Sequence, residues 1–185
     1  MFTGIVQAVG RIVRLTPFEI EAGGLDLTGV AVGDSICVQG ACLTVTSLTG
    51  RGFTTDVSAE TLAVTAGLDK PGPVNLEKAV RVGDALGGHL TTGHLDGVGE
   101  MVGREGSVYG FRLPPALARY VARKGSICVD GVSLTVNRIE GDRFEVNLIP
   151  HTLGVTTLSR LAPGVKVNLE IDLIARYVER MLGER

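Results

Sequence analysis

The chain has 185 residues and a formal net charge of −2, and its 18 Lys and Arg residues are scattered singly. This length suffices for one large domain or two small ones, and without a basic stripe we expect no nucleic-acid partner. No apolar run reaches the ~20 residues of a membrane-spanning helix, and three cysteines without Cys-x-x-Cys spacing favour neither a disulfide framework nor a zinc site, so we expect a cytoplasmic protein that binds no membrane.

The first half of the chain consists of short β-rich runs separated by Gly, Asp and Pro. Six such runs can be identified, at residues 3–15, 18–22, 35–39, 41–48, 53–57 and 73–77. Runs of this length and spacing are typical of an antiparallel barrel or sandwich. A short turn is expected after Ser58.

The second half repeats the first. Residues 35–65 match residues 126–156 at fourteen positions with an offset of 91 (126 minus 35), and further similarities extend the repeat at both ends. Two copies of this size indicate a duplicated domain rather than a solenoid, which needs shorter periods and more units. We therefore expect an N-terminal barrel at 1–87 and a C-terminal barrel at 88–172.

Two helices are expected in the second half. Residues 114–122 begin with two prolines, which suit a first helical turn, and the basic residues in and around this helix, Arg119, Arg123 and Lys124, are expected on a solvated face. In the segment 173–185, apolar residues recur at helical spacing, at positions 174, 177, 178, 181 and 182. This narrow stripe suits a partner helix and favours self-association; the alternative is that it packs on its own barrel.

Cys42 lies in a repeated strand whose two faces differ. The polar face carries alternate side chains: Cys42, Thr44 and Thr46, with Ser133, Thr135 and Asn137 at the matching positions. Threonines alone are ordinary residues of a solvated strand. A thiol, however, is usually buried, and the residue that replaces it in the second copy is another small nucleophile. The pattern therefore predicts a pocket in each copy.

The histidines favour no metal site. His89 and His94 are five residues apart, on opposite faces of any strand, and no carboxylate or thiolate cluster completes a ligand set. His94 occupies the position of Ile5 in the repeat, so it is either a base or a hydrogen-bonded structural histidine. Ser133 has no Gly-x-Ser-x-Gly elbow, and no dinucleotide fingerprint is present, so neither a hydrolase triad nor a nicotinamide cofactor is indicated.

Several motifs together resemble riboflavin synthases of the α-chain type. They are "MFTGIVQ", "GACLTV", "GGHLTTGHLDGVG", "KGSICVDGVSLTV" and "IPHTLGVTTL", in this order over essentially the whole chain. The resemblance implies an all-β fold of two tandem six-stranded antiparallel Greek-key β-barrels related by pseudo-two-fold symmetry, plus a C-terminal α-helix. It also implies a homotrimer assembled through that helix, lumazine synthase as a further partner, and no cofactor.

The reaction that this resemblance implies explains the duplication. Riboflavin synthases are transferases that move a four-carbon unit between two molecules of 6,7-dimethyl-8-ribityllumazine, giving riboflavin and a ribitylamino-pyrimidinedione. Two identical substrates require two similar sites, and in the family the reacting pair lies between the N-terminal barrel of one subunit and the C-terminal barrel of the next.

The resemblance also assigns substrate-binding positions that follow the repeat. Those assigned to the N-terminal barrel are Gly4, Ile5, Val6, Cys42, Leu43, Thr44, Asp56, Val57, Ser58, Ala59, Glu60 and Thr61, with Phe2 and Thr3 at the border. Those assigned to the C-terminal barrel are Gly93, His94, Leu95, Ser133, Leu134, Thr135, Asn147, Leu148, Ile149, Pro150, His151 and Thr152, with Lys124 reaching a ligand across the interface. Glu60 is matched by His151, so contacts of its carboxylate are not carried over to the second copy.

Cys42, His94, Ser133 and Thr135 are the candidate catalytic residues. The reaction begins with removal of a proton from the C7 methyl group of one lumazine, and a neutral imidazole such as His94 is a suitable base or relay. The other lumazine needs a nucleophile at C7, which Cys42, Ser133 or an ordered water could supply. We expect the alignment of the two rings to contribute most to the rate.

Two other functions remain compatible with the sequence. Non-catalytic proteins of the same twin-barrel family bind a lumazine or flavin as an optical antenna, but they typically lose the pocket residues that this chain retains at Cys42, His94, Lys124 and Ser133. A β-barrel interaction module that binds no ligand is the more distant alternative.

Overall fold

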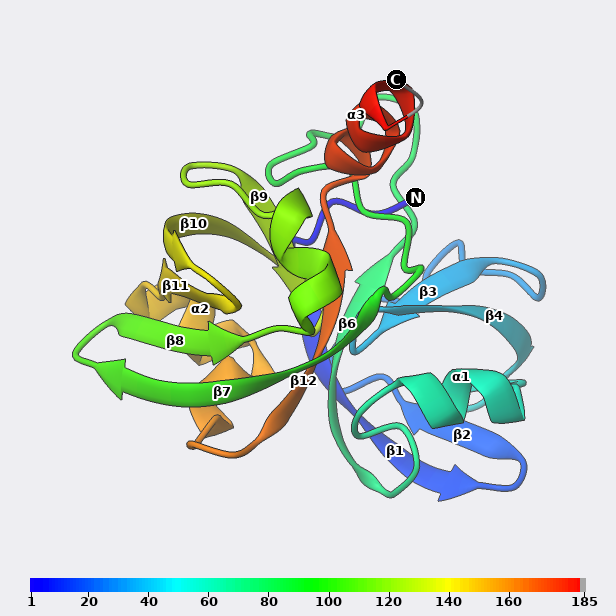
Figure 1. Ribbon diagram of the computed structural model, residues 1–185. Coiled ribbons are helices and arrows are strands. Elements are labelled where there is room, and N and C mark those ends of the chain that lie inside the picture. The colour runs from blue at the N-terminus through cyan, green and yellow to red at the C-terminus, as the bar shows by residue number, and fades with distance from the viewer. Residues whose placement is uncertain (184–185) are drawn as a thin grey trace.

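Two closed antiparallel barrels form the body of the computed structural model, which describes residues 1–183 (Figure 1). The strands of the first barrel are β1 (Ala8–Leu15), β2 (Phe18–Glu21), β3 (Ser35–Val38), β4 (Ala41–Leu48), β5 (Gly52–Thr55) and β6 (Gly72–Lys78). Those of the second are β7 (Gly97–Glu105), β8 (Val108–Arg112), β9 (Ser126–Val129), β10 (Val132–Glu140), β11 (Arg143–Asn147) and β12 (Lys166–Ile171).

The two barrels share one topology. The first closes in the order β1-β2-β5-β4-β3-β6, and the second, written from β7, closes as β7-β8-β11-β10-β9-β12. Strands at equivalent places in the repeat therefore have equivalent neighbours. The predicted all-β fold of two tandem six-stranded barrels is confirmed.

Within residues 1–183, four short helices lie between strands, and a fifth follows the last strand. They are α1 (Ala59–Val64), the 3-10 helix η1 (Pro115–Tyr120), α2 (Pro150–Val155), the 3-10 helix η2 (Thr157–Arg160) and α3 (Leu173–Leu182). The turn expected after Ser58 is α1, and the Ser58 hydroxyl caps it by accepting from the Thr61 N–H at 3.0 Å. The helix expected at 114–122 is η1, whereas α2 was not anticipated.

Each barrel has its own hydrophobic core. Strand alternation directs Ala41, Leu43 and Val45 inward, where they are at most 5% exposed, and the matching residues of β10 are buried likewise. The predicted core face of the repeated strand is therefore confirmed. Cys42 and Ser133 lie on the opposite face and are half-buried.

The segments that precede β1 and β7 are exchanged between the barrels. The first run was predicted to start at residue 3, but β1 begins at Ala8, and the residues before it cross to the other barrel. The Gly4 carbonyl accepts from the Ser133 N–H at 2.8 Å, and the Gly93 carbonyl accepts from the Cys42 N–H at 3.0 Å. The crossing segment before β1 therefore hydrogen-bonds to β10 of the second barrel, and the crossing segment before β7 hydrogen-bonds to β4 of the first.

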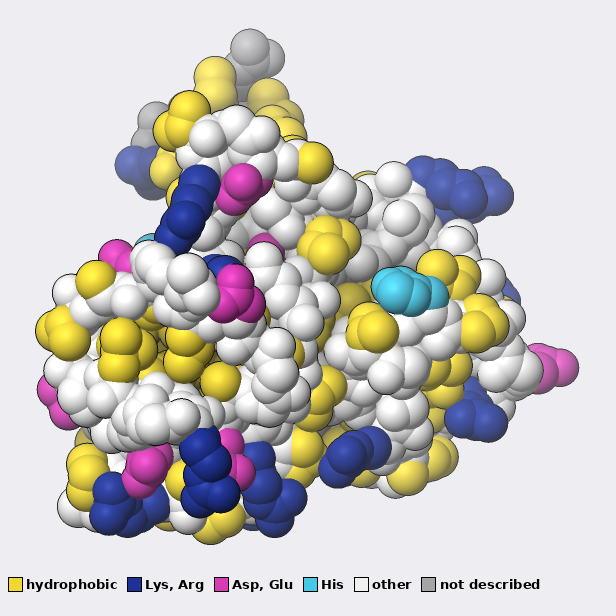
Figure 2. Space-filling view, turned by 180° about the vertical axis from the view of Figure 1, so that it is seen from behind, with side chains coloured by type: hydrophobic (Ala, Val, Ile, Leu, Met, Phe, Trp, Pro, Cys, Tyr) yellow, Lys and Arg dark blue, Asp and Glu magenta, His cyan; other side chains and the backbone are white. Residues whose placement is uncertain are grey.

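Helix α3 projects from the body beside the N-terminus (Figure 1). Polar contacts hold its base: the Tyr120 hydroxyl donates to Glu179 at 2.8 Å, and Arg176 pairs with Asp96 at 2.6 Å. The predicted apolar stripe is exposed, with Met181 at 78%, and Figure 2 shows hydrophobic side chains gathered on this projection. The alternative in which the stripe packs on its own barrel is therefore wrong.

Candidate functional site

A pocket of about 230 Å³ opens beside Cys42. Its three walls come from β4, α1 and the crossing segment before β7, and its lining residues are Ala41, Cys42, Glu60, Thr61, Val64, Thr65, Gly93, His94 and Leu95. The pocket thus combines a thiol, an imidazole and a carboxylate from three separate parts of the chain. It confirms that the polar face of β4 borders a pocket at Cys42.

The crossing segments correct the expected grouping of site residues. The resemblance placed Gly93, His94 and Leu95 with the C-terminal barrel, but they line the pocket of the N-terminal barrel. Conversely, Gly4 contacts Ser133, and Val6 packs against the core of the C-terminal barrel. The expected grouping is wrong because the repeat assigns each crossing segment to the barrel that follows it in the sequence. In the structure, each crossing segment contacts the other barrel.

Close backbone approach makes the crossing glycines necessary. Gly93 has a φ of +77°, and a β-carbon there would lie 2.6 Å from the Cβ of Cys42. Gly4 has a φ of +72° and would place a β-carbon 2.6 Å from the Cβ of Ser133. Both the left-handed conformation and the lack of space exclude larger residues.

Two buried carboxylates fix the crossing segments. Glu77 accepts hydrogen bonds from the Thr3 N–H at 2.7 Å, the Thr3 hydroxyl at 2.6 Å and the Gly4 N–H at 3.0 Å. Glu170 makes the equivalent three bonds to residues 92 and 93, at 2.6, 2.7 and 2.9 Å. Burial raises the pKa of Glu77, although the donors from Thr3 and Gly4 oppose this effect.

His89 is a site residue that the sequence did not reveal. Its Nδ1 lies 2.6 Å from the Ser133 hydroxyl, and its Nε2 is buried without a hydrogen-bond partner within residues 1–183. Burial lowers the pKa of His89, while the negative charge of Asp172 opposes this shift. Burial therefore favours the neutral form of the ring beside the hydroxyl. Because the repeat relates Thr92 to Thr3, His89 has no counterpart in the first copy that could have marked it.

The remaining predicted residues fall into three groups. Leu43, Leu134 and Leu148 are buried in the barrel cores, so only their backbones could meet a ligand. The exposed or half-buried ones lie on β4, β10 and the end of β11, at α1 and α2, and before β9: Thr44, Asp56, Val57, Ser58, Ala59, Lys124, Thr135, Asn147, Ile149, Pro150, His151 and Thr152. Phe2 and Thr3 are buried at the crossing segment.

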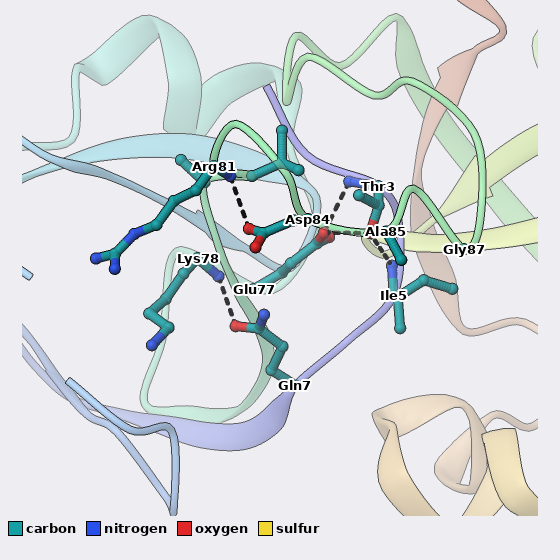
Figure 3. A pocket seen from close by; sticks show the side chains of 11 residues that line it. Thr3, Ile5, Gln7, Glu77, Lys78, Arg81, Asp84, Ala85 and Gly87 are labelled. Atoms are coloured by element: carbon teal, nitrogen blue, oxygen red, sulfur yellow. Dashed lines mark hydrogen bonds between the residues drawn. The ribbon is translucent and has the colours of Figure 1, made fainter. Parts of the chain in front are cut away.

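A larger pocket of about 480 Å³ lies beside the first crossing segment, bordered by Thr3, Ile5 and Gln7 (Figure 3). Its polar groups are already engaged: Asp84 accepts from the Arg81 N–H at 2.8 Å, and Gln7 accepts from a backbone N–H at 3.0 Å. It contains neither a thiol nor an imidazole. Reactive groups are therefore concentrated at the smaller pocket and at Ser133.

The described residues offer neither a metal cluster nor a membrane-spanning helix. Between residues 1 and 183, no group of three His, Cys, Asp or Glu side chains is placed to hold a metal ion. Within that range, no helix has the length and apolar character needed to cross a bilayer. The three cysteines are free, and burial raises the pKa of the Cys37 and Cys128 thiols.

Comparison with known proteins shows a family for both halves of the chain. The lumazine binding domain family matches residues 3–79 and again 92–172. The chain is 46% identical to riboflavin synthase of Mycobacterium tuberculosis, with 98% of each chain covered. It is 44% identical to riboflavin synthase of Photobacterium phosphoreum, over 98% of this chain and 89% of that one.

Solved structures agree with this match. The fold is similar to LumP complexed with riboflavin, with a TM-score of 0.80, 28% identity and coverage of 92% of this chain and 99% of that one. LumP complexed with 6,7-dimethyl-8-(1'-D-ribityl) lumazine gives a TM-score of 0.76 at 25% identity, with coverage of 92% and 98%. With two matched domains, the same double barrel and relatives aligned along nearly its whole length, this chain belongs to the riboflavin synthase family of lumazine-binding proteins.

Proposed function

We propose that this protein is a riboflavin synthase that converts two molecules of 6,7-dimethyl-8-ribityllumazine into riboflavin and 5-amino-6-ribitylaminouracil. The observation that carries the proposal is the duplicated site: Cys42 and Ser133 occupy equivalent strand positions, each covered by a glycine from the other barrel. A reaction that consumes the same molecule twice requires two such sites. Relatives named riboflavin synthase, aligned with 98% of the chain, support it.

The reaction needs no cofactor for its balance. The two products together contain all the atoms of the two substrates, so the enzyme supplies alignment, proton transfer and a nucleophile that adds only transiently. One lumazine loses a proton from its C7 methyl group, and the resulting carbanion attacks the second lumazine. In all, the two methyl carbons of the first lumazine form C–C bonds to C6 and C7 of the second, and the two C–N bonds that held this four-carbon unit in its former ring break. The protons released by the two methyl groups are taken up by nitrogens of the remaining pyrimidinedione. Bringing two rings into register makes these steps effectively unimolecular.

The two sites differ in the groups that can assist. At the N-terminal barrel, His94 and Glu60 face the pocket together with Cys42. At the C-terminal barrel, the His89–Ser133 hydrogen bond provides a neutral imidazole that can accept the hydroxyl proton. Identical substrates thus meet different chemistry, which allows one to serve as donor and the other as acceptor.

A trimer formed through α3 completes this proposal. Exposed apolar residues on α3, such as Tyr177 at 62% and Met181 at 78%, provide a stripe that a partner helix would cover. Assembly would bring the N-terminal barrel of one subunit to the C-terminal barrel of the next, as the family arrangement requires. Lumazine synthase is a further candidate partner.

The experiment is incubation of the purified protein with the lumazine while flavin absorbance is followed. A riboflavin synthase gives one riboflavin for every two lumazines consumed. The variant Cys42→Ser tests whether the reaction requires the thiol. If alignment of the two rings contributes most to the rate, we expect the variant to keep its rate within about tenfold. Tight binding of lumazine without any flavin would instead support an antenna protein, and no binding at all would support a plain interaction module.

A further inference from the structure

Two buried asparagines, Asn75 and Asn168, form a polar seam between the barrels. Asn75 on β6 and Asn168 on β12 occupy equivalent positions there and are 1% and 0% exposed. Figure 1 shows these two strands at the centre of the molecule, where the barrels meet. Two amides sealed from water at this place must be hydrogen-bonded, and their partners lie in the opposite barrel.

The Asn168 amide ties together two parts of the N-terminal barrel. Its Nδ2 donates to the Gln39 carbonyl at 2.9 Å and to the Ala66 carbonyl at 3.0 Å, and its Oδ1 accepts from the Ala66 N–H at 2.7 Å. Gln39 lies in the turn that leads into β4, and Ala66 directly follows Thr65, the C-cap of α1. These are two walls of the Cys42 pocket.

Asn75 makes the reciprocal connection. Its Nδ2 donates to the Asp130 carbonyl at 2.8 Å, and its Oδ1 accepts from the Thr157 N–H at 2.8 Å. Asp130 lies in the turn that leads to Ser133, and Thr157 directly follows Thr156, the C-cap of α2. In the second copy, the equivalent elements β10 and α2 are thus bridged in the same way, again by an amide from the other barrel.

We propose that Asn168 is a positioning residue for the substrate site of the N-terminal barrel and Asn75 for that of the C-terminal barrel. Each barrel thereby sets the spacing between strand and helix in the other barrel's site. This inference rests on the proposed function, because it assumes that both sites bind a lumazine or flavin. Loss of either amide leaves buried backbone groups unpaired and frees the two walls to separate.

The backbone of each asparagine is fixed as firmly as its side chain. The Asn75 N–H donates to the Gln39 Oε1 at 2.9 Å, and the Asn168 N–H donates to the Asp130 Oδ1 at 2.8 Å. Gln39 therefore contacts Asn75 of its own barrel through its side chain and Asn168 of the other barrel through its carbonyl. The backbone of each asparagine thus stays hydrogen-bonded in a variant that loses only the side-chain amide.

The test measures the two sites separately, with riboflavin as a probe that does not react alone. Protection of Cys42 from iodoacetamide reports the N-terminal site, since Cys37 and Cys128 are buried and burial raises the pKa of both thiols. After Cys42 has been blocked with a bulky maleimide, the remaining quenching of flavin fluorescence reports the C-terminal site.

The expected pattern is crossed. Asn168→Ala should raise the riboflavin concentration that half-protects Cys42 about tenfold and change the C-terminal site less than about twofold, while Asn75→Ala should do the opposite. The two variants are matched controls, since they delete the same amide from equivalent strands. Equal weakening of both sites by both variants, or an effect of each on its own barrel, would overturn the inference.

Proline variants cover the case in which an alanine variant does not fold. Ala66→Pro removes the N–H that donates to the Asn168 Oδ1. Thr157→Pro removes the N–H that donates to the Asn75 Oδ1, together with a hydroxyl that accepts from Gln39 at 3.5 Å. The preceding residues, Thr65 (φ −119°, ψ 161°) and Thr156 (φ −131°, ψ 168°), already have the extended conformation that proline requires before it. The same crossed loss is expected. If the wild-type protein binds no flavin, the proposed function is overturned as well. If the wild-type protein makes riboflavin but the variants show no crossed loss, this inference alone is overturned.

Discussion

Replacing Asp130 by Asn should make stability at alkaline pH higher than in the wild type. Asp130 is 2% exposed, and burial raises the pKa of its carboxyl from 3.8 to about 7, against the opposing hydrogen bond from the Asn168 N–H. Its equivalent in the first copy is the neutral Gln39. In the wild type, the second copy therefore has a carboxylic acid between the barrels where the first copy has a neutral amide.

The sign and size follow from linkage. Because the folded pKa lies above the unfolded value, the folded state binds the extra proton between pH 3.8 and about 7, and stability falls as pH rises through this window. A shift of about three units at 1.36 kcal/mol each corresponds to about 4 kcal/mol as an upper limit above pH 7. The asparagine has no proton to lose, so this cost should vanish.

Urea unfolding at fixed protein concentration, at pH 4.5 and pH 8, measures the effect. We expect Asp130→Asn to exceed the wild type by about 2 to 4 kcal/mol at pH 8 and to approach it at pH 4.5. Asp69→Asn, at an exposed position, is the control for a simple loss of charge. A difference between Asp130→Asn and the wild type that does not change with pH would refute the reasoning. Gln39→Glu should introduce the same pH dependence in the first copy.

Three further outcomes are expected. Glu170→Gln should lower stability by about 2 kcal/mol in thermal unfolding, since it weakens three hydrogen bonds of 2.6 to 2.9 Å; an unchanged melting temperature would contradict the role of the carboxylate. Gly93→Ala should reduce turnover more than about tenfold, whereas Gly83→Ala, also at positive φ but with open space around it, should not; equal losses would mean that crowding at Cys42 is unimportant. Met181→Asp should lower the sedimentation coefficient without lowering the unfolding temperature of the barrels, and an unchanged oligomer would exclude α3 as the interface.

Most of the fold follows from local pattern. The run at 41–48 coincides with β4, and the one at 18–22 coincides with β2 to within a residue, because turn residues and two-residue alternation are properties of the strand itself. The repeat then supplied the second barrel without further assumptions. The run at 3–15 was predicted too long, because a segment of extended backbone has the same residue pattern whether or not it pairs in a sheet.

The sequence by itself determined that this protein is a duplicated β-rich domain with Cys42 and Ser133 at equivalent places, since the repeat and the strand alternation can be read from the order of the residues alone. Only the tertiary structure decided which segments meet. In the structure, Gly93 lies against Cys42, and His89 contacts Ser133. Asn75 and Asn168 are buried between the barrels. The physical reason is that these contacts join residues 44 to 129 positions apart, and a repeat states that two segments are alike without stating which barrel each one will cover.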